Sequence, residues 1–260
     1  MASPTIGRMS VLDTPGPCDV AIIGGGAAGV LTAIGLLRGA RSALRILILE
    51  PSLPLARGVA YATRRPEHLL NVPAGKMGGF PDQVEDFLDY LIHAQAFPGV
   101  ARDMLAASFV PRWRYAEYLR ARLQQAVNSS AAQLEIRAER VLELDRDGDG
   151  LRLVLASGQA VQARRVVLAS GNALRPLPAR GAGSLPEGKR VEAWDFATVR
   201  GIAEHADVAI IGSGLSMADT VVSLLASGHR GRIHVLSRHA LMPLPHAKGP
   251  AADYDPEPLL

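Results

Sequence analysis

Continuous apolar runs mark two places in the chain, and each is followed by an apolar segment of helical length. In the first place, the run Asp19–Gly24 precedes Ala27–Gly39, and a further run, Leu44–Glu50 (LRILILE), comes next. Parallel strands buried on both faces are apolar throughout, so this order predicts a β-α-β unit. The same order recurs from Asp207, through SMADTVVSLLASG to IHVLSR, and predicts a second unit.

The chain between the two units changes character twice. Residues 51–82 are rich in Pro, Gly and Arg and are typical of a loop. Helices are predicted at about 83–95, after the cap signal Pro81-Asp82, and at about 112–127, after Pro111.

Strand-like segments follow the second of these helices. The clearest turn among them is DGDG at 147–150, which favours a β-meander. A further buried strand, Arg165–Gly171 (RVVLASG), ends in small residues. The expected meander strands are Gln133–Arg137, Arg140–Asp145, Leu151–Ala156 and Ala160–Ala163.

The two β-α-β units read as copies of one another. Residues 19–50 align with 207–238 without a gap, and the last column of this alignment pairs Glu50 with Arg238. That pair matters because a carboxylate at this strand end accepts from ribose hydroxyls, whereas a guanidinium fits a 2′-phosphate. The identical pairs are Asp19/Asp207, Val20/Val208, Ala21/Ala209, Ile22/Ile210, Ile23/Ile211, Gly24/Gly212, Gly26/Gly214, Thr32/Thr220, Leu36/Leu224 and Leu37/Leu225.

The first unit carries G-x-G-x-x-G between its strand and its helix. Gly24 permits the tight turn, Gly26 lets the backbone approach a pyrophosphate, and Gly29 lets the helix pack closely on the strand. The helix N-terminus adds unpaired N–H groups and a positive dipole end, although an ordinary glycine-rich turn is the alternative. The expected dinucleotide-binding residues here are Gly24, Gly26, Ala27, Ala28, Gly29 and Glu50.

The second unit keeps only part of this pattern. Gly212 and Gly214 remain, but Met217 replaces the third glycine and weakens the pattern. Ser216 and the helix N-terminus are expected to meet phosphate, and Arg238, with the serine before it, favours NADPH over NADH. A decayed or merely structural copy is the alternative.

Composition narrows the class of protein. The 260 residues are 48% hydrophobic and carry a formal charge of +3, which suits anionic small ligands but does not indicate nucleic acid. The sequence has neither the apolar run of a membrane span nor the metal-ligand spacing of a metal site. The single cysteine, Cys18, suits a reducing compartment, so we expect a cytoplasmic protein acting on a small molecule, away from membranes.

Two such units, separated by a helical insert and a meander, resemble the two-dinucleotide-binding-domain flavoproteins. Three stretches resemble more closely the bacterial FAD/NAD(P)-binding protein family. They are ARGVAYATRRPEHLLNVPAGKMGGFPD (56–82), FVPRWRYAEYL (109–119) and GHRGRIHVLSRHALMPLPH (228–246). The resemblance covers nearly all of residues 18–246, and it implies FAD in the first unit and NAD(P)H in the second.

The resemblance also implies which loop residues meet FAD. Arg57 and Gly58 would lie close to the pyrophosphate, where an arginine pairs with phosphate oxygens. Asn71 and Met77 would lie nearer the isoalloxazine ring.

Three further positions follow from the same resemblance. Val141 would meet adenine through backbone atoms. Ser170 and Gly171 would close the FAD site at the end of their strand.

The expected fold is α/β, with a Rossmann-like FAD-binding domain and a partial second Rossmann-like NAD(P)-binding unit. The first domain carries a helical insert at about 83–130 and a β-meander at about 132–164. The expected divisions are a disordered tail at 1–17, the FAD-binding domain at 18–182, a linker at 183–206, and the second unit with an irregular tail at 207–260.

A flavin paired with a nicotinamide serves disulfide reduction, electron transfer or monooxygenation. The lone cysteine excludes a disulfide relay within the chain, which leaves an NADPH-dependent monooxygenase or reductase in outline similar to N-hydroxylating and Baeyer–Villiger enzymes. The sequence identifies no catalytic side chain, no substrate and no oligomeric state. The alternative is a truncated or vestigial, non-catalytic nucleotide-binding protein.

Overall fold

The computed structural model describes residues 16–172, 177, 179–186 and 188–244. The chain forms two compact units, Met1–Arg175 and Pro176–Leu260, and each is described by itself. Most of the expected tail at 1–17, up to residue 15, lies outside the described residues, as does the chain beyond Leu244.

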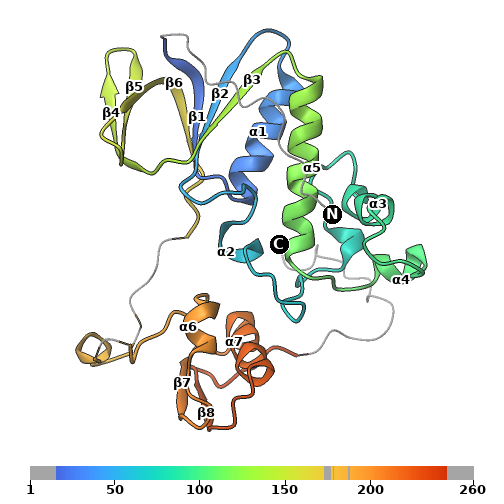
Figure 1. The fold of residues 1–260 in the computed structure, drawn as a ribbon, viewed down its shortest axis with the longest axis vertical. Coiled ribbons are helices and arrows are strands. Elements are labelled where there is room, and N and C mark those ends of the chain that lie inside the picture. Colours follow the sequence, from blue (N-terminus) through green and yellow to red (C-terminus); the bar gives the residue numbers. More distant parts are fainter. Residues whose placement is uncertain (1–15, 173–176, 178, 187, 245–260) are drawn as a thin grey trace, which may run out of the picture. The chain divides into compact units, whose positions relative to one another are not determined.

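A mixed six-stranded sheet forms one side of the first unit (Figure 1). Its strands are β1 (Cys18–Ile23), β2 (Arg45–Leu49), β3 (Gln133–Arg137), β4 (Val141–Asp147), β5 (Gly150–Leu155) and β6 (Ala160–Leu168). Their spatial order is β3-β2-β1-β6-β5-β4. Neighbours from β3 to β6 pair in parallel, and β6 also pairs antiparallel with β5, which pairs antiparallel with β4. The strands β1 and β2 are buried almost throughout, as their continuous apolar sequences predict.

Two strand assignments differ from the sequence prediction. Gln133–Arg137 is not part of the meander, because it pairs in parallel with β2, with Leu134 opposite Ile46. The strands expected at Ala160–Ala163 and Arg165–Gly171 are one strand, β6, which pairs with β1 on one side and β5 on the other. Sequence patterning identifies a strand but carries no information about its partner, so the edge strand β3 was assigned to the wrong neighbours.

Helices α1 and α5 lie side by side along the sheet (Figure 1). The helices predicted at about 83–95 and 112–127 are α3 and α5. The residues before Asp86 form turns, so α3 begins later than the sequence predicts. The long helices are α1 (Ala27–Gly39), α3 (Asp86–His93) and α5 (Trp113–Ser129). Shorter elements that the patterning did not predict are α2 (Gly58–Tyr61), η1 (Ala74–Lys76) and α4 (Arg102–Ala106).

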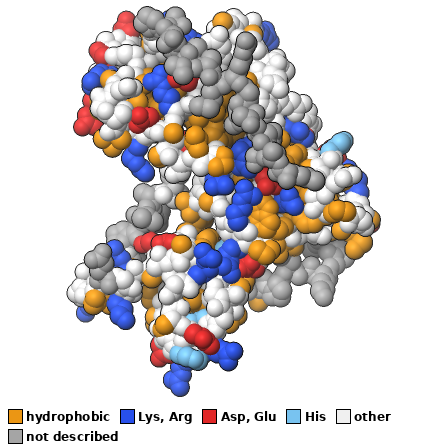
Figure 2. All heavy atoms as spheres, in the orientation of Figure 1, with side chains coloured by type: hydrophobic (Ala, Val, Ile, Leu, Met, Phe, Trp, Pro, Cys, Tyr) orange, Lys and Arg blue, Asp and Glu red, His pale blue; other side chains and the backbone are white. Residues whose placement is uncertain are grey.

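The main apolar core joins these helices to the sheet. Ile22 of β1 and Ile34 of α1 are fully buried in it. Phe87 of α3 contacts two rings of α5, Tyr115 and Tyr118, with centroids 5.3 and 5.2 Å apart. Figure 2 shows that hydrophobic side chains also reach the surface over this helical part, where Val84 and Met104 are examples.

The second unit contains the β-α-β order that the repeat predicts. Its elements are η2 (Ala182–Ser184), α6 (Phe196–Arg200), β7 (Val208–Ile211), α7 (Leu215–Ala226) and β8 (Ile233–Leu236). The strands β7 and β8 pair in parallel. The helix α6 packs on α7, although it lies within the stretch 183–206 that we expected to be a linker.

The third glycine of the motif sets how closely α1 approaches β1. A Cβ atom added at Gly29 would lie 2.0 Å from the carbonyl oxygen of Gly24, far inside any real contact. A larger residue would therefore push the start of α1 away from the sheet. The packing role that the pattern assigns to Gly29 is confirmed.

We predict that Gly29→Ala lowers the free energy of unfolding of the first unit by roughly 2–3 kcal/mol, because the added methyl group overlaps backbone atoms. Gly35→Ala, on the same helix with nothing within 4 Å of the added atom, should leave it unchanged or raise it by up to about 1 kcal/mol. Urea unfolding followed by Trp113 fluorescence, in a Trp194→Phe background, measures both. Equal stability of the two variants would contradict this account of Gly29.

Candidate dinucleotide-binding site

The glycine turn joins β1 to α1 at the carboxyl end of the parallel strands. Gly24 has φ of +106°, and its amide donates to the carbonyl of Leu49, the last residue of β2, at 2.9 Å. A Cβ atom at Gly24 would lie 2.2 Å from the carbonyl oxygen of Ala169. Both the dihedral angle and the lack of space require glycine here.

The first turn of α1 presents free backbone donors. Gly26 is the N-cap without a side chain to cap the helix, and no acidic residue lies in the first turn. Within the described part of the chain, the amides of Gly26, Ala27 and Ala28 have no acceptor. Free amides at a positive dipole end suit an anionic group such as a phosphate.

Glu50 follows β2, and its carboxylate lies against the glycine turn. One oxygen, Oε2, accepts from the Gly25 amide at 2.7 Å, and Oε1 accepts from the Ser52 amide at 2.8 Å. Each carboxylate oxygen has a second lone pair, so capacity for ribose hydroxyls remains. Glu50 thus lies where the sequence predicts, and it also holds the turn in place.

The loop 55–58 lies on the same turn. The Ala56 amide donates to the Gly25 carbonyl at 2.7 Å. A Cβ atom built on Gly26 would be 3.6 Å from the Cα of Gly58, so the two glycines face each other at close range. Arg57, which lies between Ala56 and Gly58 in the loop, is half-buried, and its side chain has no hydrogen-bond partner among the described residues. The fold therefore brings the loop of Arg57 and Gly58 to the helix N-terminus, whereas the contact of these residues with a pyrophosphate stays a prediction.

Ser170 and Gly171 follow β6 beside the turn. The Ala169 amide donates to the Ile23 carbonyl at 2.8 Å, and both following residues are exposed. Val141 begins β4 shortly after β3 ends, half-buried beside Leu155. Their positions at the carboxyl edge are defined, whereas their contacts with a cofactor stay predictions.

Asn71 and Met77 lie in a loop that packs on the helices. Asn71 is exposed, and Met77 is half-buried against the main core. The Ala74 amide between them donates to the Ser108 carbonyl at 2.9 Å. These contacts do not bring either residue to the glycine turn, so their approach to a flavin ring stays a prediction.

A partly buried ion pair ties this loop to α3 and α5. Arg122 donates to both carboxylate oxygens of Asp86, at 2.7 and 2.8 Å, and the Tyr118 hydroxyl donates to the same carboxylate at 2.7 Å. The Tyr118 oxygen accepts from the Gly79 amide at 3.0 Å. Burial raises the pKa of Asp86, but the hydrogen bonds from Arg122 and Tyr118 outweigh it and hold that pKa below its usual value.

The second unit repeats the turn with a looser fit. Gly212 has φ of +105° and Gly214 is the N-cap of α7, but atoms added at these glycines would meet nothing within 4 Å. Met217, in place of the third glycine, is buried. The Ser216 hydroxyl accepts from the Trp194 Nε1 at 3.1 Å, which leaves its own O–H available to donate, so the expected phosphate contact stays a prediction.

Strand pairing corrects the alignment at the end of the repeat. The Gly212 amide donates to the Leu236 carbonyl at 2.8 Å, the same bond that Gly24 makes with Leu49. Leu236 therefore corresponds to Leu49, and Ser237 rather than Arg238 takes the place of Glu50. The gapless alignment misplaced this pair because the second unit is one residue shorter between its paired strands: Val20 pairs with Ile46, 26 positions on, whereas Val208 pairs with Ile233, 25 positions on. Arg238 is exposed, one residue beyond the position that corresponds to Glu50.

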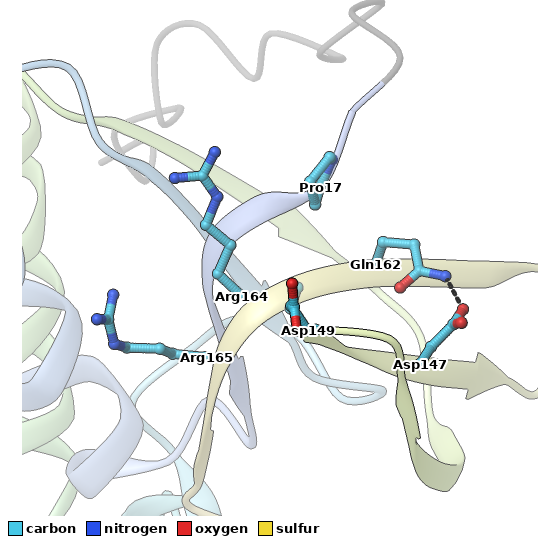
Figure 3. A pocket seen from close by; sticks show the side chains of 8 residues that line it. Pro17, Asp147, Asp149, Gln162, Arg164 and Arg165 are labelled. Carbon is cyan, nitrogen blue, oxygen red and sulfur yellow. Dashed lines mark hydrogen bonds between the residues drawn. The ribbon is translucent and has the colours of Figure 1, made fainter.

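A hollow of about 560 Å³ lies elsewhere on the first unit, between the β4–β5 hairpin, β6 and Pro17. Pro17 precedes β1, so the hollow lies at the opposite end of β1 from the glycine turn. Figure 3 shows Arg164 and Arg165 pointing away from the hydrogen-bonded pair Asp147 and Gln162. The hollow therefore does not belong to the candidate site.

Sequence reasoning missed two features that shape the site. One is the left-handed conformation of Ala56, with φ of +66°, which a residue other than glycine gives no reason to expect. The other is the Asp86 network, of which only the spacing of Tyr118 and Arg122 on one helix face is visible in the sequence.

No group of three or more His, Cys, Asp or Glu that could hold a metal ion occurs among the described residues. None of the helices described is long and apolar enough to cross a membrane.

Comparison with known families identifies the first unit. The sequence model of the family described as FAD-NAD(P)-binding matches residues 21–173. No curated protein matches the chain.

Solved structures with the same fold include several flavoproteins. A double mutant of the flavin monooxygenase from Stenotrophomonas maltophilia is 20% identical, with a TM-score of 0.53 over 85% of this chain and 58% of that one. The Kutzneria sp. 744 ornithine N-hydroxylase, described with reduced FAD, NADP⁺ and L-ornithine, is 17% identical, with a TM-score of 0.60 over 85% and 53%. The thioredoxin reductase from Lactococcus lactis is 15% identical, with a TM-score of 0.50 over 85% and 56%. The chain spans less than two thirds of the length of each.

We predict that the Asp86 network stabilises the first unit above about pH 4 and fails in acid. Because the folded-state pKa lies below the unfolded value of about 4, the contribution is complete above the unfolded pKa and is lost as pH falls through the folded one. Asp86→Asn should cost on the order of 2 kcal/mol at pH 7 and progressively less towards pH 3, in urea unfolding followed as for Gly29. Asp89→Asn, which breaks only an exposed pair with Arg102, should cost less than about 1 kcal/mol. If the loss of unfolding free energy in Asp86→Asn stays the same as the pH falls, the stabilising role of the Asp86 carboxylate is refuted.

Proposed function

Because the chain belongs to the FAD-NAD(P)-binding family, we propose that it is an FAD-dependent oxidoreductase that draws electrons from NADPH and acts on a small molecule as a monooxygenase or reductase. The observation that carries the proposal is the turn at the start of α1, where three free amides lie between Glu50 and the 55–58 loop. The fold shared with flavin-dependent monooxygenases supports it.

The residues present fit the diphosphate and ribose of FAD. The amides of Gly26, Ala27 and Ala28 would donate to phosphate oxygens, and the unpaired Arg57 side chain would add charge. Glu50 would accept from the ribose while keeping its bond to the Gly25 amide. An added Cβ atom at Gly26 would meet only Gly58, at 3.6 Å, whereas one at Gly24 or Gly29 would overlap backbone atoms at 2.2 and 2.0 Å. The turn is therefore less crowded at Gly26, where a ligand would approach, than at the two glycines that set the helix packing.

The second unit would hold the nicotinamide nucleotide. By the corrected alignment, the Ser237 hydroxyl would lie at the ribose and the exposed guanidinium of Arg238 just beyond it. A neutral hydroxyl can donate to a 2′-phosphate without repelling it, and the guanidinium pairs with its charge. This arrangement favours NADPH over NADH.

The flavin, when bound, supplies the capacity to take hydride from the nicotinamide and pass the electrons on. The protein's part is to fix the cofactor by its diphosphate and to shape access. The described residues offer no cysteine pair, since Cys18 is the sole cysteine of the sequence, so the acceptor is not a disulfide formed within this chain.

The proposal predicts that the purified chain binds FAD and shows absorption bands at about 370 and about 450 nm. Anaerobic addition of NADPH should bleach both bands. A protein that cannot be loaded with FAD would contradict the proposal. A yellow protein that NADPH does not bleach would favour the alternative of a non-catalytic nucleotide-binding protein.

The assignment of Arg238 predicts a change of coenzyme preference. Arg238→Ala should weaken NADPH binding by about tenfold, because one charge-assisted contact to the 2′-phosphate is lost, and leave NADH binding nearly unchanged. Rates of flavin bleaching at varied NADPH and NADH measure both. Arg230→Ala, an exposed arginine of the same unit paired with Glu204, is the matched control and should change neither. Equal losses for the two coenzymes would contradict the role of Arg238.

A further inference from the structure

The loop 55–58 holds a conformation that it would not adopt by itself. Ala56 is fully buried with φ of +66°, a left-handed conformation that costs a residue with a Cβ roughly 1–2 kcal/mol. Leu55 is buried as well, and its side chain blocks the space beside Gly25. Contacts from outside the loop must therefore hold it on the glycine turn.

One of these contacts comes from helix α5. The Arg120 Nη1 donates to the Leu55 carbonyl at 3.1 Å, and the next residue, Ala56, donates to the Gly25 carbonyl at 2.7 Å. Because α5 packs along α1, the guanidinium is anchored on the same helix pair that carries the turn. Arg120 thus links the body of the unit to the loop that carries Arg57.

The charges around Arg120 indicate an anionic ligand. Burial lowers the pKa of Arg120, and the nearby cations Arg57 and Arg64 lower it further against the attraction of Glu117. The Glu117 carboxylate is already hydrogen-bonded to Arg64 and Arg114, at 3.0 and 3.1 Å. Among the described residues, neither Arg120 nor Arg57 has a carboxylate within hydrogen-bond distance. Two half-buried cations of like charge without an acid are stabilised when an anion binds between or beside them.

We propose that Arg120 is a positioning residue of the diphosphate site: it holds the 55–58 loop on the glycine turn and adds positive charge beside Arg57. The inference rests on the proposed binding of FAD by the first unit. Its ligand is the diphosphate portion of a dinucleotide, not the adenosine portion, because the contacts of Arg120 lead to the turn and to Arg57 rather than to Glu50.

The test compares ligands with and without phosphate on the full chain. Dissociation constants for FAD, ADP and adenosine are measured by calorimetry for the wild type, Arg120→Met, Arg120→Lys and Arg114→Met. Arg120→Met should weaken ADP and FAD by at least about tenfold and adenosine by less than about twofold, since only the phosphate-bearing ligands lose the charge and the held loop. Arg120→Lys keeps the charge but not the planar donor fork. Its affinity for ADP should therefore lie between those of the wild type and Arg120→Met. Arg114→Met removes a charge from the same helix and should bind ADP like the wild type.

Salt provides a readout that a merely structural role would not move. Raising ionic strength should weaken ADP binding less in Arg120→Met than in the wild type. Unchanged ADP affinity in Arg120→Met, or in Arg120→Lys should the first variant unfold, overturns the inference, and so does an equal loss for adenosine. A wild type that binds neither FAD nor ADP overturns the proposed function itself and the inference with it.

Discussion

The close approach of helix α1 to strand β1 is the constraint on which the rest of the first unit depends. With Gly24 and Gly29 the helix starts directly at the end of the strand, because a single added carbon at either position would overlap backbone atoms. This contact directs the free amides of the first helical turn to the carboxyl edge of the sheet. There they meet Glu50 from β2 and the end of β6, so one packing requirement gathers groups from three strands.

The candidate site is then completed by parts that are not strands. The 55–58 loop lies against the turn because Gly25 accepts from Ala56 and because Arg120 holds the Leu55 carbonyl. The same helix α5 carries Tyr118 and Arg122, which fix Asp86 and, through Gly79, the loop of Met77. One helix therefore positions both loops that the family resemblance assigns to FAD, and its first residues, 113–119, belong to one of the stretches that carry that resemblance.

The second unit shows what happens when the same constraint is relaxed. Its turn keeps the dihedral angle and the strand hydrogen bond at Gly212, but Met217 replaces the tightly packed glycine and the space around the turn is open. The span from its first strand to the paired second strand is one residue shorter than in the first unit, which moves Ser237 into the place of Glu50. The two repeated turns thus differ in the residue at the strand end, Glu50 in one and Ser237 in the other, and that difference supports two different nucleotides in the proposed function.

The sequence by itself determined the two β-α-β units, the helices α3 and α5, and the glycine turn with its terminal acid, because these follow from local periodicity and from dihedral demands of single residues. Only the tertiary structure decided that β3 pairs with β2, that residues 160–168 form the single strand β6, and that Ser237 corresponds to Glu50 in the repeat. It also decided the roles of Ala56 and Arg120. Each of these depends on which segments distant in sequence lie together. A residue pattern records how a side chain is partitioned between core and water, but not which backbone carbonyl or neighbouring strand it will meet.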